Sequence, residues 1–180
     1  MALKATIHKF DLQIADMDRG YYDSHALTIA RHPSETVERM MIRVLAFAMT
    51  AHERLQFGGG VSTADEPDLW RRDLTGDIEE WVELGLPDPR RVHKACGRAG
   101  LVRVILYGGQ KAMTWWEQER AGLERHRNLV VTRLLPEQTA ALAELGERSG
   151  SLQCNIQDGE AWMIRGDTTV HVEPQALFGA

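Results

Sequence analysis

The sequence predicts a mixed α/β fold, with a mixed central sheet flanked by helices and extra β-hairpins at both ends of the chain. In the middle of the chain, segments with helical spacing alternate with short, β-branched segments. Near both termini, alternating apolar and polar residues flank tight-turn signals. No internal repeat or low-complexity linker interrupts the chain, so we expect residues 1–180 to form a single domain.

The composition limits the classes of protein to consider. The chain has 180 residues, 43% of them hydrophobic, and lacks both a run of roughly 18 apolar residues and a secretory signal. We therefore expect a cytoplasmic protein with no membrane contact. The net charge of −5 argues against a protein that coats DNA unspecifically, although it leaves room for a local basic stripe. Cys96 and Cys154 have no CxxC partner, so neither a disulfide framework nor a zinc ribbon is expected.

The first elements read as a hairpin followed by a helix. Alternating segments at 7–14 and 21–29 predict an antiparallel strand pair. Ser34 is the expected N-cap of the next helix, whose apolar residues keep one buried face to about Leu55. Gly58-Gly59-Gly60 then breaks the chain.

The rest of the chain alternates strands and helices. A second hairpin, 69–72 with 78–84, turns at Leu74-Thr75-Gly76. A helix is expected to start near Pro89 and to stop at Gly100. The remaining elements are expected as a strand at 101–107, a helix at 111–125, a strand at 129–134, a helix at 136–145, and a terminal hairpin around Asp158-Gly159 with a last strand at 169–172.

The second hairpin carries an unusual number of carboxylates. With the turn at 74–76, antiparallel pairing brings Asp68 close to Val82 and Glu83. The two-residue period of a strand then puts one set of residues on a single face: Asp77, Glu79, Trp81, Glu83 and Gly85. Facing carboxylates are destabilising unless one is protonated or a cation lies between them, so the pattern indicates a divalent metal with hard oxygen ligands, naturally Mg²⁺. The same spacing also fits an exposed hairpin end in which Glu83 pairs with a nearby arginine.

A basic stripe follows on the next helix. Arg91, Lys94 and Arg98 share one helical face, and Arg90 and Arg103 extend a window without acids. A phosphate group is one candidate ligand for this stripe, and a solvated helix face paired with neighbouring acids is the other reading. A lysine beside a carboxylate pair has the chemistry to orient an attacking water and to offset charge on a phosphate.

Taken together, several segments resemble the YaeQ family, a variant branch of the PD-(D/E)XK nuclease superfamily, and the resemblance covers nearly the whole chain. The segments that carry it are Ser34-Glu35-Thr36-Val37-Glu38-Arg39-Met40-Met41 with Arg43, Asp65-Glu66-Pro67-Asp68-Leu69-Trp70, Leu74-Thr75-Gly76-Asp77, Trp81-Val82-Glu83-Leu84-Gly85 and Lys94-Ala95-Cys96-Gly97-Arg98. The resemblance implies a restriction-endonuclease-like core with elements in the order αβββαβ.

The resemblance also implies roles for single residues. Asp68 matches the PD aspartate and Glu83 the (D/E) acid, the two ligands of Mg²⁺, or of Mn²⁺, in active members. Asp77 competes with Asp68 for the first role, and Glu38 resembles a helical carboxylate that joins the metal site. The superfamily lysine is replaced by Gly85, and the nearest substitute is Lys94.

Two functions remain open at this point. The first is a Mg²⁺-dependent phosphodiesterase acting on nucleic acid, with Asp68, Glu83, Lys94, Asp77 and Glu38 as candidate catalytic residues and Arg90, Arg91 and Arg98 as candidate nucleic-acid contacts. The second is a catalytically inactive binding module of the same fold, which the family's association with transcription elongation also fits. A homodimer stays open as the assembly state.

Overall fold

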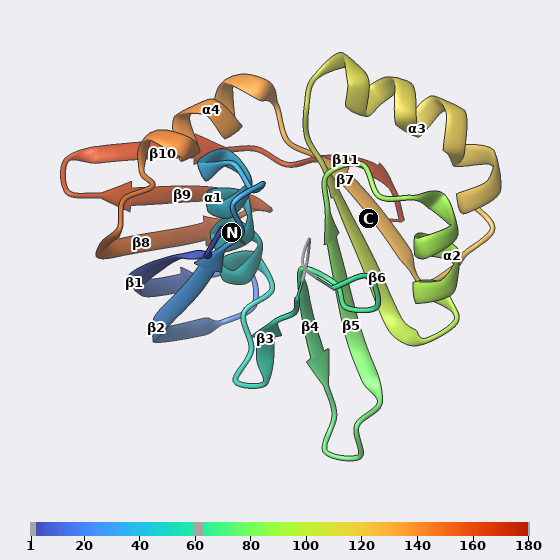
Figure 1. Cartoon of the computed structure of the whole chain (residues 1–180), viewed down its shortest axis with the longest axis horizontal. Helices are drawn as coiled ribbons and strands as arrows, with labels where there is room; N and C mark the ends of the chain where they lie inside the picture. The colour runs from blue at the N-terminus through green and yellow to red at the C-terminus, as the bar shows by residue number, and fades with distance from the viewer. Residues whose placement is uncertain (1–2, 60–62, 180) are drawn as a thin grey trace. The chain divides into compact units, whose positions relative to one another are not determined.

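The computed structural model describes residues 3–59 and 63–179 of the chain. Among these residues it contains four helices and two mixed sheets, so the expected mixed α/β class is confirmed (Figure 1). The chain divides into two compact units. Unit 1 comprises Met1–Ala51 and Glu137–Glu173, and unit 2 comprises His52–Pro136 and Pro174–Ala180. The expectation of a single domain over residues 1–180 stays a prediction.

Unit 1 is built on a five-stranded sheet in the order β10-β9-β8-β1-β2. The expected N-terminal hairpin and the expected C-terminal strands are therefore parts of one sheet, joined by parallel pairing of β1 with β8. Alternating residues of β1 are buried, as expected for a sheet with one covered face. The strands are β1 (Thr6–Asp16), β2 (Tyr21–Arg31), β8 (Ser149–Gln157), β9 (Glu160–Arg165) and β10 (Thr168–Val172), and the helices of this unit are α1 (Val37–Met49) and α4 (Pro136–Glu144).

The bounds of α1 differ from those expected. Thr36, not Ser34, caps the helix, and its side chain accepts a hydrogen bond from the backbone N–H of Arg39 at 3.1 Å. Ser34 instead bonds to the ring of His32. The helix ends at Met49, before the expected end near Leu55, and residues 50–54 form a loop that leads into β3 (Leu55–Phe57).

Unit 2 contains a six-stranded sheet in the order β11-β7-β6-β5-β4-β3. Strands β5, β6 and β7 run parallel, and β3, β4 and β11 are antiparallel to their neighbours. Helices α2 and α3 cover one face of this sheet, over a core that includes Trp81, Val104 and Trp116 (Figure 1). The bounds are β4 (Leu69–Arg72), β5 (Ile78–Leu84), α2 (Pro89–Cys96), β6 (Ala99–Leu106), α3 (Gln110–Leu123), β7 (Leu129–Arg133) and β11 (Gln175–Phe178).

The expected hairpin at 69–72 and 78–84 is confirmed residue for residue by β4 and β5. The elements α1-β3-β4-β5-α2-β6 follow one another in the order αβββαβ, although β3 precedes the glycines that were expected to come before all three strands.

The expected stop of α2 at Gly100 is wrong. The helix ends at Cys96, because Gly97 closes it with backbone bonds, and Gly100 lies in β6. No helix in the described part of the chain is long and apolar enough to cross a membrane.

Candidate functional site

The register of the β4–β5 hairpin places Asp68 beside the end of β5. Asp68 directly precedes β4, and Leu69 pairs with Val82. The backbone N–H of Asp68 donates to the carbonyl of Val82 at 3.1 Å, and its Oδ2 accepts from the N–H of Leu84 at 2.9 Å. Asp68 is therefore held through both its backbone and its side chain, and it is buried. The expected proximity of Asp68 to Val82 and Glu83 is confirmed.

Glu83 is the second buried carboxylate of this site. Its Oε1 accepts hydrogen bonds from Trp81 Nε1 at 2.8 Å and from Arg91 Nε at 2.5 Å. Burial raises the pKa of Glu83 above its ordinary value, the bonds from Arg91 and Trp81 oppose this rise, and the charge of Asp68 adds to it. The two carboxylates are thus close enough to repel each other.

Arg91 connects this pair to the helix that follows. Asp88 caps α2 by accepting from the backbone N–H of Arg90, and Pro89 occupies the first turn. Arg91, in the first turn of α2, donates a hydrogen bond from its guanidinium to Glu83. The same guanidinium also donates to the backbone carbonyls of Ala64 and Glu66. Arg91 therefore supplies a positive charge at Glu83 and ties the segment before β4 to α2.

A pocket of about 450 Å³ opens beside α2, and we call it the basic pocket. Arg98 lies over the ring of Trp81, with Cζ 5.4 Å from the ring centroid. Lys94 Nζ lies 3.5 Å from a carboxylate oxygen of Asp65, and both side chains are largely exposed. The lining residues are Ala64, Asp65, Trp81, Asp88, Arg90, Arg91, Lys94, Ala95 and Arg98.

The structure thus brings the buried carboxylates Asp68 and Glu83 together with the partly exposed Arg91, and it brings Arg90, Arg91, Lys94 and Arg98 together in one pocket. Arg91 belongs to both. Within the described residues of unit 2, no third carboxylate, histidine or cysteine joins Asp68 and Glu83 in a group that would hold a metal ion.

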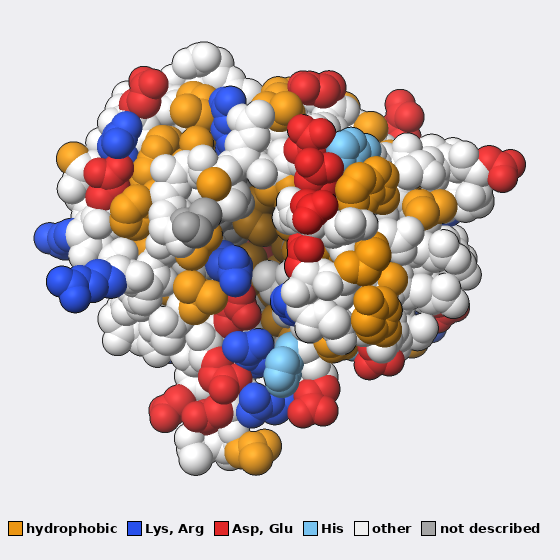
Figure 2. Space-filling model, turned by 180° about the vertical axis from the view of Figure 1, so that it is seen from behind, with side chains coloured by type: hydrophobic (Ala, Val, Ile, Leu, Met, Phe, Trp, Pro, Cys, Tyr) orange, Lys and Arg blue, Asp and Glu red, His pale blue; other side chains and the backbone are white. Residues whose placement is uncertain are grey.

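Asp77 lies apart from this group. It precedes β5 in an exposed turn, where its backbone N–H donates to Asp73 Oδ1 at 2.9 Å. Asp77 was expected to share a strand face with Glu83. A bulge interrupts this alternation, as the shift in pairing between Arg71 and Arg72 shows. Figure 2 shows acidic and basic side chains intermingled over this projecting end of the hairpin, where Glu79 pairs with Arg54 and Arg71.

Gly85 explains why a lysine is missing two residues after Glu83. Its φ is +92°, a backbone conformation that favours glycine over residues with a side chain. Its N–H also donates to the carbonyl of Ile105 at 2.9 Å, which fixes the end of β5 against β6. Any lysine serving this site therefore has to come from another element, and Lys94 on α2 lines the basic pocket.

Glu38 lies in the first turn of α1, in unit 1, so its expected part in the site stays a prediction.

Two other features were not foreseen from the sequence. Trp81 forms a wall of the basic pocket and also donates to Glu83, which its place two residues before Glu83 on one strand could have indicated.

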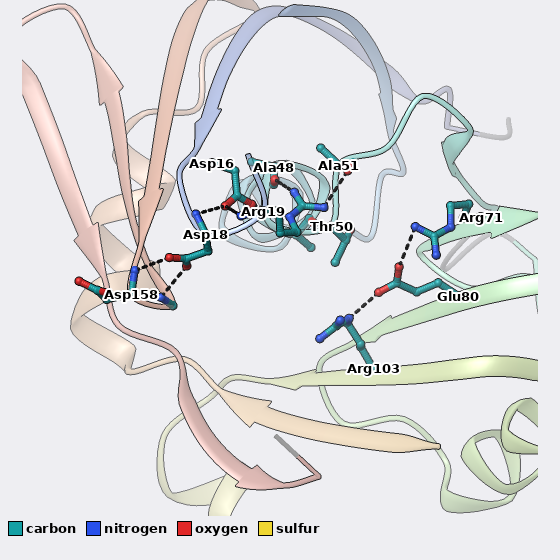
Figure 3. A network of polar contacts seen from close by, with 12 residues as sticks. Asp16, Asp18, Arg19, Ala48, Thr50, Ala51, Arg71, Glu80, Arg103 and Asp158 are labelled. Atoms are coloured by element: carbon teal, nitrogen blue, oxygen red, sulfur yellow. Dashed lines mark hydrogen bonds and ion pairs between the residues drawn. The ribbon is translucent and has the colours of Figure 1, made fainter. Parts of the chain in front are cut away.

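The second unforeseen feature is a buried carboxylate at Glu80. Arg103 donates to it from β6, and Arg71 lies 3.7 Å away on β4 (Figure 3). Arg103, expected as part of the basic window, is thus engaged with Glu80 and does not line the basic pocket.

Comparison with known proteins gives consistent results. The model of the YaeQ protein family matches residues 1–174. The uncharacterized protein YaeQ of Salmonella typhi is 48% identical over 163 residues, 91% of this chain and 90% of that protein. The uncharacterized protein YaeQ of Escherichia coli strain K12 is 46% identical over the same shares.

Two crystal structures are similar over the whole fold. The YaeQ protein of Xanthomonas axonopodis pv. citri has a TM-score of 0.94 and 49% identity, with 98% of this chain and 99% of that chain covered. The YaeQ protein of Pseudomonas syringae has a TM-score of 0.93 and 33% identity, with 98% and 97% covered. Because the family model and these relatives each span almost the entire chain, the protein belongs to the YaeQ family.

Proposed function

We propose that this protein binds the phosphate backbone of nucleic acid in the basic pocket. The observation that carries the proposal is the convergence of Arg90, Arg91, Lys94 and Arg98 on one pocket in a chain whose net charge is −5. Arginine side chains match the oxygens of a phosphate group in pairs, and lysine adds a point charge.

The acids in the basic pocket do not prevent phosphate binding. Lys94 pairs with Asp65 and Arg90 pairs with Asp88, and all four side chains are substantially exposed. Exposed ion pairs of this kind contribute little to stability and are screened by salt. A polyanion can therefore replace Asp65 and Asp88 as the partner of these two cations at a small cost.

Binding is tested by fluorescence anisotropy with labelled single-stranded and duplex DNA and RNA, at two salt concentrations. Lys94→Ala and Arg98→Ala should each weaken binding and lower the dependence of log K on log salt by about one unit. Lys111→Ala is the matched control, because Lys111 is an exposed lysine of α3 that does not line the basic pocket. Equal affinities for all four proteins would refute the proposal.

A second candidate function is phosphodiester hydrolysis of the bound strand in an Asp68–Glu83 metal site. It is favoured by the proximity of the two carboxylates, which the contribution of Asp68 to the raised pKa of Glu83 reflects. Hard carboxylate oxygens suit Mg²⁺ or Mn²⁺, and a divalent ion held by Asp68 and Glu83 would offset charge that develops on the phosphate. Lys94 Nζ, at the pocket wall, would orient the attacking water.

The competing cation in this second function is Arg91. Its Nε is 2.5 Å from Glu83 Oε1, so a metal ligated by that oxygen has to replace the arginine. Pocket binding needs no such replacement, which is why we place binding first.

Three further expectations from the sequence stay predictions beside this proposal: a cytoplasmic location, a link to transcription elongation and a homodimer.

Hydrolysis is tested by incubating wild type and variants with the same nucleic acids in Mg²⁺ or Mn²⁺. If the second function holds, Asp68→Asn and Glu83→Gln abolish cleavage while Asp77→Asn, in the exposed turn, retains it. Glu80→Gln is the matched control, because Glu80 is a buried carboxylate of the same strand that bonds to Arg103. Absence of cleavage by the wild type, with binding intact, would reject hydrolysis and leave the binding function standing.

A further inference from the structure

The β9–β10 hairpin of unit 1 gathers four side chains on one face. His171 pairs with Trp162 across the two strands, and their rings are stacked with centroids 4.7 Å apart and planes 6° from parallel. Glu173 lies two residues after His171, and Glu160 lies two residues before Trp162. Because side chains two residues apart share a face of a sheet, the register brings both glutamates beside the imidazole.

The distances confirm this grouping. His171 Nε2 lies 2.7 Å from Glu160 Oε2 and 3.7 Å from Glu173 Oε1. One ligand atom from each of the three residues lies within 4.8 Å of the other two. The backbone N–H of Glu173 donates to Gln138 Oε1 at 3.2 Å, which holds the chain after β10 in place.

This arrangement leaves a charge imbalance. Two carboxylates face the same ring nitrogen, and one N–H at Nε2 can donate a well-formed hydrogen bond to only one of them. Like charges across neighbouring strands are destabilising unless a cation lies between them. A divalent ion bound to the two carboxylates and to Nε2 would remove this repulsion.

We propose that Glu160, His171 and Glu173 form a binding site for a divalent transition metal of the Zn²⁺ type. An imidazole nitrogen with two carboxylate oxygens is a donor set suited to such metals, whereas Mg²⁺ prefers oxygen ligands alone. With bonds of about 2.1 Å, a tetrahedral ion sets its ligand atoms about 3.4 Å apart. The side chains are 38–53% exposed, so rotamer changes suffice to reach that spacing.

The stacked indole of Trp162 adds two properties. It fixes the plane of the His171 ring and so limits the directions in which Nε2 can point. It also places a fluorophore in contact with a metal ligand, and a bound paramagnetic ion such as Co²⁺ quenches a neighbouring indole. The site lies in unit 1 and shares no residue with the basic pocket, so it is independent of the function proposed above.

The experiment is calorimetric titration of the full-length protein with ZnCl₂ and with MgCl₂. We expect one Zn²⁺ per chain. His171→Ala and Glu160→Gln should each lower the affinity for Zn²⁺ about tenfold or more. Even the loss of an outer hydrogen-bond partner of a metal ligand lowers metal affinity ~10–100-fold. His32→Ala is the matched control, because His32 is a histidine of unit 1 that bonds to Ser34 and not to a carboxylate. Circular dichroism verifies that each variant is folded.

A fluorescence titration locates the metal. Co²⁺ should quench part of the emission of the wild type, and Trp162→Phe should remove that part while leaving Zn²⁺ binding within about twofold, because the indole is not a ligand. The proposal is overturned if Zn²⁺ does not bind, if Mg²⁺ binds as tightly, or if His171→Ala binds Zn²⁺ like the wild type. Quenching that persists in Trp162→Phe places the metal elsewhere and overturns it as well.

Discussion

Glu83 and Arg91 form an ion pair whose two members have very different surroundings. The carboxylate is buried, whereas the guanidinium is partly exposed and lines the basic pocket. A cation that both balances a buried acid and faces a ligand pocket couples the ionisation of Glu83 to whatever the pocket binds. The ionisation of Glu83 is therefore the residue-level property to measure first.

The pH dependence of stability should carry a specific sign. The pKa of Glu83 is raised by burial, so the folded state holds its proton at a pH where the unfolded chain has released it. Wild type should therefore lose stability relative to Glu83→Gln as the pH rises from about the ordinary glutamate value of 4.5 through the raised pKa. Urea denaturation of both proteins between pH 4 and 8 measures the difference. A relative gain by wild type would mean that Arg91 outweighs burial.

The two cysteines should be poorly reactive thiols in the folded protein. Burial raises the pKa of Cys96 to about 11 and that of Cys154 to about 12, where the charge of Asp16 adds to the effect. Because the thiolate is the nucleophile, both should react with a disulfide reagent at pH 8 at least about tenfold more slowly in the native protein than in urea. Rapid modification of native Cys96, assigned by mass spectrometry, would contradict this expectation.

At the level of elements, the sequence was most informative where a turn and an alternating pattern coincide. Leu74-Thr75-Gly76 fixed the turn of the β4–β5 hairpin, and the register with Asp68 near Glu83 followed from it. Short edge strands such as β3 and β11 have no such signal, because three or four residues do not establish a period. The bulge that separates Asp77 from Glu83 could not be read from the pattern either, since one extra residue leaves no compositional mark.

The cap of α1 offers a direct test at this scale. Thr36 caps the helix through its side chain, whereas Ser34, which the sequence suggested, bonds to His32 outside the helix. Thr36→Ala should therefore lower the free energy of unfolding by about 1 kcal/mol. Ser34→Ala should change it by less than about 0.5 kcal/mol, as for other surface substitutions. Chemical denaturation of the two variants decides between the caps, and the reverse order would show that the helix begins earlier.

For the molecule as a whole, the sequence indicated the class of fold but not how distant strands join. The parallel pairing of β1 with β8 aligns Lys9 with Ser149 and Asp16 with Ile156, across most of the chain. Local periodicity identifies each strand and its buried face but contains no information about its partner. The division into two units could not be predicted from the sequence for the same reason, because each unit combines two segments that are far apart in the chain.

The C-terminal segment provides a test of this organisation. After β10, in unit 1, the chain continues into unit 2, where β11 pairs with β7 and Phe178 packs against the core with its ring centroid 6.2 Å from that of Trp116. Deleting residues 174–180 exposes the edge of β7 and removes this packing. Hydrogen exchange should therefore accelerate in β7, while β1 and β8 of unit 1 keep their protection.

A milder variant separates packing from strand pairing. Phe178→Ala keeps the backbone of β11 but removes the ring beside Trp116. It should therefore lower the free energy of unfolding by roughly 1–3 kcal/mol and accelerate hydrogen exchange in β7 less than the deletion does.

Exchange that accelerates equally in β7 and in the β1–β8 pair after the deletion would show that the two units unfold together. Acceleration confined to β7, β6 and β5 of the unit 2 sheet would show that the C-terminal strand stabilises unit 2 alone, as its contacts predict.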